Sequence, residues 1–127
     1  MARTIVPGER PLYWIASSRD DVLAFPEEVK DEIGYALSVA QFGGKHPKAK
    51  PWKGAGGGVL EIVEDFSGDT YRAVYAVCFA GAVYVLHAFQ KKSKSGRKTA
   101  KTDIDLIYKR LRAAKQDYEE RYGNRKK

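Results

Sequence analysis

Residues that bind metals or form disulfides are scarce in this chain of 127 residues. It contains one cysteine, Cys78, and two histidines, His46 and His87. A single cysteine excludes an internal disulfide framework and a cysteine-based metal site, and two histidines alone do not predict a zinc site. No apolar stretch approaches membrane-spanning length, and the first ten residues lack the apolar core of a signal peptide. We therefore expect a cytoplasmic protein that binds no metal and no cofactor and does not associate with a membrane.

The composition predicts one folded domain. Hydrophobic residues make up 43% of the chain, which includes 8 Tyr, 5 Phe and 2 Trp. A chain of this length can bury a single core, and no internal repeat marks a second unit. We predict one domain over residues 1–127, with flexible ends at 1–10 and 123–127. The oligomeric state does not follow from the sequence.

The net charge of +7 is unevenly distributed. Residues 1–89 carry 9 Lys or Arg against 11 Asp or Glu, whereas residues 90–127 carry 14 against 5. The excess begins where an apolar run, 82–89, passes into a tract with five cations and no acid. A basic region of this kind favours a nucleic-acid or acidic protein partner, although a solvated basic helix and tail has the same composition. The five cations are Lys91, Lys92, Lys94, Arg97 and Lys98.

Hydrophobic periodicity predicts an α+β fold with a small antiparallel sheet. Ser18 begins a short helix as its N-cap, and Thr102 to Asp105 has the spacing of a capping box. The loop 45–58 is predicted to lack regular structure because it contains two prolines and four glycines. The expected elements are a strand at 12–16, a helix from 18 to before Pro26, a helix at 27–42, a three-stranded meander at 59–64, 70–79 and 82–89, and a C-terminal helix of about twenty residues.

Three short motifs, in this order and over residues 11–122, resemble the RelE/ParE superfamily of bacterial toxins. They are Pro51-Trp52-Lys53-Gly54, Tyr71-Arg72-Ala73-Val74-Tyr75 and His87-Ala88-Phe89-Gln90-Lys91-Lys92-Ser93. Within that superfamily the chain is most similar to the HigB-type, phage-derived Gp49-like branch. The resemblance implies a RelE-like fold and the toxin of a type II toxin–antitoxin pair. It also implies ribosome-dependent mRNA cleavage, with mRNA, the ribosome and a helix-turn-helix antitoxin as partners.

Metal-independent RNA cleavage by the 2′-OH needs a base, positive charge on the phosphorane and an acid for the 5′-oxygen. Arg72 matches the strand arginine of the family and is our first choice for binding the phosphorane. A guanidinium stays protonated and suits bidentate phosphate binding. The structural alternative is an arginine at the edge of the sheet that pairs with Glu61 or Glu64 on the adjacent strand.

Other lysines are candidates for the same site. Lys91 and Lys92 match the basic pair of the family, and strand alternation allows at most one of them to share the face of Arg72. Lys53 matches a family lysine and is a candidate general base, with a basic loop residue as the alternative. Candidate RNA contacts are Lys50, Trp52, Lys94, Arg97 and Lys98.

The remaining aromatic and imidazole groups have structural alternatives. Trp52 either stacks on a base or anchors its loop to the core. His87 alternates with Val83, Val85 and Phe89 on one strand face, which favours a satisfied, half-buried histidine over a catalytic one. His46, in the loop, is the weaker catalytic candidate.

Two other functions remain open at this stage. ParE-like members share the fold and bind DNA gyrase, and a non-catalytic, nucleic-acid-binding phage protein would also be basic. The chain departs from relatives that carry basic residues on the second strand, because it reads Glu61-Ile62-Val63-Glu64-Asp65 there.

Overall fold

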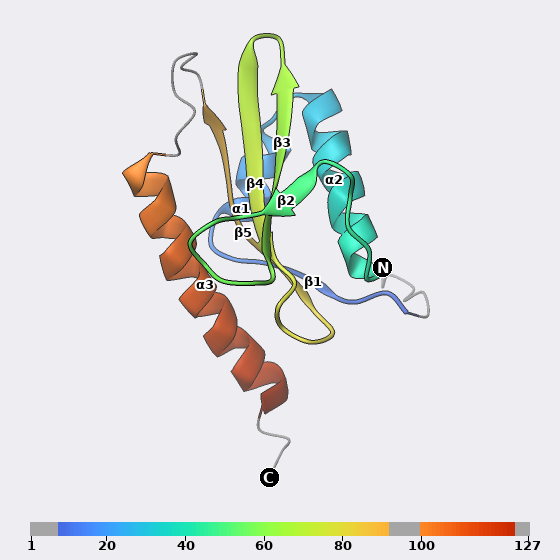
Figure 1. The fold of residues 1–127 in the computed structure, drawn as a ribbon, viewed down its shortest axis with the longest axis vertical. Helices are drawn as coiled ribbons and strands as arrows, with labels where there is room; N and C mark the ends of the chain where they lie inside the picture. The colour runs from blue at the N-terminus through green and yellow to red at the C-terminus, as the bar shows by residue number, and fades with distance from the viewer. Residues whose placement is uncertain (1–7, 92–99, 124–127) are drawn as a thin grey trace.

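The protein forms an α+β structure in which helices pack on both faces of one sheet (Figure 1). A computed structural model describes residues 8–91 and 100–123. The predicted flexible ends lie mostly outside these ranges, as do Lys92, Lys94, Arg97 and Lys98. The elements are β1 (Leu12–Trp14), α1 (Ser18–Leu23), α2 (Glu27–Gln41), β2 (Ala49–Pro51), β3 (Val59–Phe66), β4 (Asp69–Ala76), β5 (Val83–Lys91) and α3 (Lys101–Tyr122).

The five strands form a mixed sheet in the order β1-β5-β4-β3-β2. The predicted antiparallel meander is confirmed for β3, β4 and β5. The sheet as a whole is not antiparallel, because β1 pairs with β5 in parallel. The predicted α+β class is confirmed, but the edge strand β1 runs parallel to its neighbour, which was not predicted.

The predicted loop 45–58 contains a short edge strand, β2, and that part of the prediction is wrong. Lys50 pairs with Glu61, and Pro51 pairs with Leu60. An edge strand tolerates proline because the missing N–H would face away from the sheet. The strand is only three residues long, which is too short for the alternation of apolar and polar residues that predicts a strand.

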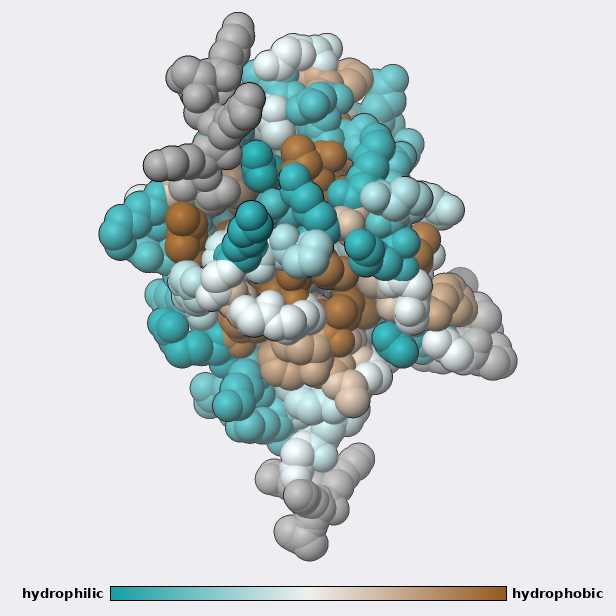
Figure 2. Space-filling view, viewed as in Figure 1, coloured by the Kyte–Doolittle hydropathy of each residue, from teal (hydrophilic) through white to brown (hydrophobic). Residues whose placement is uncertain are grey.

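Each face of the sheet has its own hydrophobic core. On one side the sheet packs against α1 and α2, and α2 buries an apolar stripe of Val29, Ile33, Ala36, Leu37 and Ala40. On the other side it packs against α3, through Ile107 and Ala114 and the partly buried Ile104, Leu111 and Tyr118. The predicted helix at 27–42 and the predicted C-terminal helix are thus both confirmed. Figure 2 shows hydrophilic side chains over much of the viewed face, with hydrophobic ones exposed between them.

The helix ends differ from the predicted caps. Helix α1 is capped at Ser17, whereas Ser18 is buried and donates a hydrogen bond to the Val85 carbonyl (3.2 Å). Helix α3 begins at Lys101, and its capping residue, Ala100, has no side-chain hydrogen bond to offer. Asp105, the carboxylate of the predicted capping box, instead pairs with Lys101 at 3.0 Å, and the neighbouring Asp103 contacts His87. The predicted N-cap at Ser18 and the predicted capping box at Thr102 are therefore both wrong.

A bulge in β5 changes which residues share a face. Val74 pairs with His87 and Tyr75 pairs with Val85, so Leu86 has no counterpart on β4. Val85 consequently faces the α2 core, while His87 lies on the side of α3. The prediction that His87 shares a face with Val83 and Val85 is therefore wrong. An extra residue in one strand shifts the alternation that follows it.

Candidate active site

The sheet face that packs on α3, called here the α3 face, brings together candidate residues from four strands. Because side chains alternate along each strand, residues two apart share a face and cross-strand partners extend it. The α3 face contains three cross-strand rows: Lys50, Glu61, Val74 and His87; then Val63, Arg72 and Phe89; then Asp65, Thr70 and Lys91.

Arg72 lies on β4 in the interior of the sheet and forms an ion pair with Glu61. Its Nη1 donates a hydrogen bond to Glu61 Oε1 at 3.2 Å, and the side chains are only 14% and 11% exposed. The predicted alternative was correct about Glu61 as the partner and wrong about the edge of the sheet, because β5 and β3 flank β4. The Arg72 Nε is buried and has no hydrogen-bond partner among the residues that the structure describes.

Of the two strand-end lysines, Lys91 shares the face of Arg72. Lys91 pairs with Thr70, and Arg72, two residues further along β4, pairs with Phe89. Lys92 lies outside the described residues, together with Lys94, Arg97 and Lys98. Lys91, at the end of β5, is the one cation of the basic tract that the structure describes, and it lies on the face of Arg72.

Two lysines near β2 occupy different positions relative to Arg72. Lys50 is exposed and lies directly opposite Glu61, on the α3 face. Lys53 is exposed in the loop beyond Trp52, whose amide bonds to the Val59 carbonyl. Arg72 pairs with Val63, four residues from Val59, a distance of about 13 Å along a strand. The backbone of Lys53 therefore lies away from Arg72, whereas Lys50 is next to its ion pair.

Trp52 anchors its loop to the protein. It is only 7% exposed, and its ring packs edge-on against Tyr108 with a centroid separation of 5.4 Å. The Tyr108 hydroxyl donates a hydrogen bond to the Gly54 carbonyl. These contacts support the anchoring alternative, because a buried indole presents little surface on which a base could stack.

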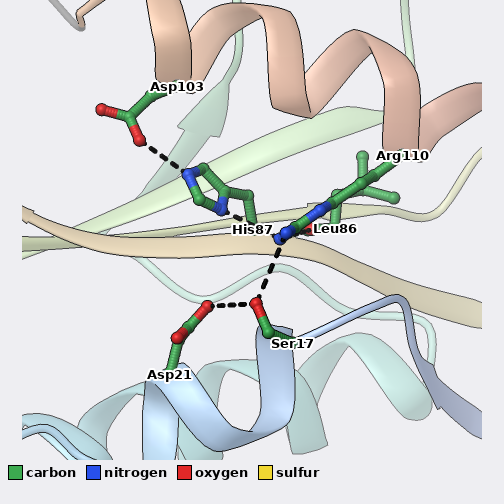
Figure 3. Close-up of polar contacts among 6 residues, drawn as sticks. All are labelled: Ser17, Asp21, Leu86, His87, Asp103 and Arg110. Carbon is green, nitrogen blue, oxygen red and sulfur yellow. Dashed lines mark hydrogen bonds and ion pairs between the residues drawn. The ribbon is translucent and has the colours of Figure 1, made fainter.

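His87 lies at the centre of a polar network that joins β5, α3 and α1 (Figure 3). Its Nδ1 lies 3.1 Å from Arg110 Nη1, and its Nε2 lies 2.7 Å from Asp103 Oδ1. A guanidinium can only donate, so Nδ1 is the acceptor and the ring proton is on Nε2, facing Asp103. The ring is 6% exposed and stacks on Phe89. This is the satisfied, buried histidine that we predicted.

Arg110 extends the network past the edge of β5 to α1. Its Nη1 also donates to the Leu86 carbonyl at 3.2 Å, and its Nη2 donates to Ser17 Oγ at 3.4 Å. Ser17 in turn donates to Asp21 at 2.8 Å. The pairing of β1 with β5 ends at Val85, so the Leu86 carbonyl lies just beyond the paired edge. Arg110 satisfies an acceptor that the sheet leaves open.

His46 is held on the other side of the sheet. It is 4% exposed, its Nε2 lies 2.8 Å from Glu32, and its Nδ1 accepts a hydrogen bond from the Lys48 amide. With both ring nitrogens bonded in a buried position, the structure gives His46 no catalytic geometry. Among residues 8–91 and 100–123, no group of three or more His, Cys, Asp or Glu is placed to hold a metal ion, and no helix is long and apolar enough to cross a bilayer.

Shifted pKa values mark the core and the C-terminal half of α3. Burial raises the pKa of Tyr75 to about 12. Burial also raises the pKa of Tyr84, and the hydrogen bond to Asp117 (2.6 Å) raises it further. For Asp117, burial alone would raise the pKa, but the hydrogen bonds from Tyr84 and Arg121 outweigh it and lower the pKa. Tyr84, Asp117 and Arg121 fix α3 to β5 at the end of the helix remote from Asp103, whereas Tyr75 belongs to the core on the α2 side.

Sequence reasoning missed two members of the site region, Asp103 and Arg110. Asp103 lies within the predicted capping box without a role of its own, and Arg110 belongs to a C-terminal helix for which only basic character was predicted. Glu61 was considered only as a partner for Arg72. Spacing alone offered no signal for Arg110, because its contacts depend on where α3 packs. The signal for Glu61 was its alternation with Val59 and Val63, which places it on the α3 face.

Comparison with known proteins agrees with the resemblance seen in the sequence. The family model described as phage derived protein Gp49-like matches residues 20–112. No curated protein matches the chain. Among solved structures, a chain of the toxin–antitoxin complex RelBE2 from Mycobacterium tuberculosis is similar, with 16% identity and a TM-score of 0.41 over 69% of this chain and 98% of that one. Because the family model spans well over half of its length, the chain belongs to the phage-derived Gp49-like family.

Proposed function

We propose that this protein is a RelE-type toxin of a type II toxin–antitoxin pair, which cleaves mRNA on the ribosome without a metal. In the proposed reaction the ribose 2′-OH attacks the adjacent phosphate, and a cognate helix-turn-helix antitoxin neutralises the protein. Membership of the Gp49-like family supports the proposal, together with the resemblance of this chain's own motifs to those of the RelE/ParE superfamily.

The observation that carries the proposal is the position of Arg72 on the α3 face. Arg72 comes from an interior strand, so its guanidinium is held by the sheet rather than by a loop. Lys91 and Lys50 lie on the same face, in the neighbouring rows. Fixed positive charge in a largely buried place is what stabilises a phosphorane without reorganisation of the site.

The experiment is expression in bacteria followed by primer extension on cellular mRNA. We expect growth arrest and cuts within translated regions, both abolished by Arg72→Ala and by the combined Lys91→Ala and Lys92→Ala change. Arg72→Lys, which keeps the charge but loses the bidentate fork, should be nearly as defective. Co-expression with a helix-turn-helix protein encoded next to this chain should restore growth.

Intact transcripts in arrested cells would overturn the proposal. Intact transcripts together with a DNA-damage response would indicate gyrase inhibition instead. Binding of RNA with no product, weakened about equally by each alanine change, would indicate a non-catalytic nucleic-acid-binding protein.

A further inference from the structure

We infer that Glu61 is the general base of the proposed reaction: its carboxylate takes the proton from the 2′-OH while the adjacent phosphate binds to Arg72. This inference rests on the proposed function and assigns the base for it. The starting observation is the acidic second strand, which the basic character of the chain does not explain. Two of its three acids, Glu61 and Asp65, lie on the face of Arg72, whereas Glu64 pairs with Tyr71 and faces the α2 core. Glu61 is the acid that contacts Arg72, while Asp65 accepts a hydrogen bond from Thr70.

The geometry allows Arg72 to hold the carboxylate and a phosphate together. The contact to Glu61 is made by Nη1 of the guanidinium. The opposite edge, formed by Nε and Nη2, can make two parallel hydrogen bonds to phosphate oxygens. The buried Nε has no partner in the described part of the chain, and a phosphate oxygen would supply one. Because Nε is buried, a phosphate reaches it only when neighbouring side chains move aside, but Glu61 can stay on Nη1.

A purely structural role explains this pair less well. A buried ion pair contributes little to stability relative to apolar residues of similar volume, because both charges lose their hydration. The neighbours of the pair on the α3 face, Val63, Val74 and Phe89, are apolar, so an apolar pair would fit the same surroundings. Stability alone therefore does not account for charged residues at these two positions.

The carboxylate retains capacity to accept the proton. A carboxylate has two oxygens with about four acceptor positions, and the contact to Arg72 occupies one of them at Oε1. Lys50 lies directly opposite Glu61 on β2 and is exposed, so positive charge borders the pair on the solvent side. An RNA phosphate attracted by Lys50 and Arg72 brings its neighbouring 2′-OH to the carboxylate.

The step is balanced as follows. Glu61 takes the 2′-OH proton, the 2′-oxygen forms a bond to phosphorus, and the bond from phosphorus to the 5′-oxygen breaks. The 5′-oxygen leaves with a proton from solvent. The products are a 2′,3′-cyclic phosphate, a 5′-hydroxyl end and a protonated Glu61, which returns its proton to water.

The test uses purified protein in a cell-free translation reaction that contains an end-labelled reporter mRNA. Glu61→Gln keeps the shape and a hydrogen-bond acceptor for Arg72 but cannot take a proton. We expect its cleavage rate to fall by about 100-fold or more, the usual contribution of a positioned base. Its co-sedimentation with ribosomes and its thermal unfolding midpoint should stay close to those of the unchanged protein. Glu61→Asp should cleave faster than Glu61→Gln because it retains a carboxylate.

The matched control is Glu64→Gln, on the same strand and the opposite face. Glu64 forms an ion pair with Lys48 at 3.0 Å, which is partly exposed and contributes little. The cleavage rate of the Glu64→Gln protein should therefore stay within about twofold of that of the unchanged protein. A Glu61→Gln protein that cleaves at the normal rate would overturn the inference and leave the proposed function intact. Loss of ribosome binding or of folding in parallel with cleavage would also overturn it, in favour of a structural role. If the unchanged protein cuts no mRNA, the proposed function fails and the inference fails with it.

Discussion

Arg110 donates a hydrogen bond to His87 Nδ1 at 3.1 Å, and this one contact fixes the tautomer of the imidazole. Since the ring proton is then on Nε2, His87 donates to Asp103 at 2.7 Å and has no ring nitrogen left for a substrate. The histidine therefore links β5 to both the first turn and the middle of α3. It helps to hold the strand that carries Lys91 against the helix that follows the basic tract.

Arg110→Ala is expected to destabilise the protein by about 2 kcal/mol, because it leaves the Leu86 carbonyl and His87 Nδ1 without their donor. Urea unfolding would measure the change. Arg112→Ala is the control, since Arg112 is exposed on the same helix and should cost little. Equal effects of the two variants would mean that the network adds nothing beyond general helix charge.

The Arg72–Glu61 pair should behave as a buried pair in a double-mutant cycle. Arg72→Met alone leaves a largely buried carboxylate unpaired and should cost about 3 kcal/mol in the free energy of unfolding. Adding Glu61→Leu should recover most of that loss, because no uncompensated charge remains. Simple additivity of the two single changes would show that the pair is well solvated instead.

Removal of the Lys50 ammonium should weaken the proposed cleavage, while removal of the Lys48 ammonium should not. Lys50 lies on the α3 face opposite Glu61, whereas Lys48 pairs with Glu64, which faces the α2 side. Lys50→Ala is expected to lower the cleavage rate by about tenfold, the value of one charge-assisted contact to phosphate. Rates from the cell-free reaction, measured at equal ribosome concentration, decide between the two lysines. Similar losses from both changes would indicate a diffuse electrostatic effect.

Gly58→Ala should disturb the loop that precedes β3. Gly58 has φ +85°, and a Cβ built on it would lie 2.5 Å from the Cβ of Cys78. Strain and overlap together should cost about 2 kcal/mol. Gly57→Ala is the matched control, because nothing lies within 4 Å of a Cβ at that position and its φ is not in the left-handed region. Thermal unfolding of the two variants gives the comparison, and a stable Gly58→Ala protein would mean that the loop can rearrange freely.

Asp117 should stabilise the protein in a pH-dependent manner. Its pKa is lowered from 3.8 despite burial, through hydrogen bonds from Tyr84 and Arg121. A lowered carboxyl pKa gives stability that is full above the unfolded value and is lost as the pH falls through the folded value. Asp117→Asn should therefore reduce the free energy of unfolding at pH 7, and the difference should shrink below about pH 4. A difference that stays constant from pH 7 to pH 2.5 would contradict this origin.

Much of the fold follows from local pattern. The apolar stripe and the glycines after it predict a helix at 27–42, and the observed α2 ends one residue earlier, at Gln41. There the Gly43 and Gly44 amides bond to the Ala40 and Val39 carbonyls. The alternation in β3 and β4 likewise predicts two strands joined by a tight turn. The strand β2 was missed because three residues with a proline carry no periodicity, and only pairing to β3 makes them a strand.

For the candidate site, the sequence by itself determined the residue types and their order along the chain. It indicated an acidic strand, then a strand arginine and then a lysine-rich strand end. Only the tertiary structure decided which of these share a face. The bulge at Leu86 turned His87 towards α3, and strand register placed Arg72 beside Glu61 and on the face of Lys91. Register and bulges depend on contacts between distant segments, so a strand's own sequence does not fix them.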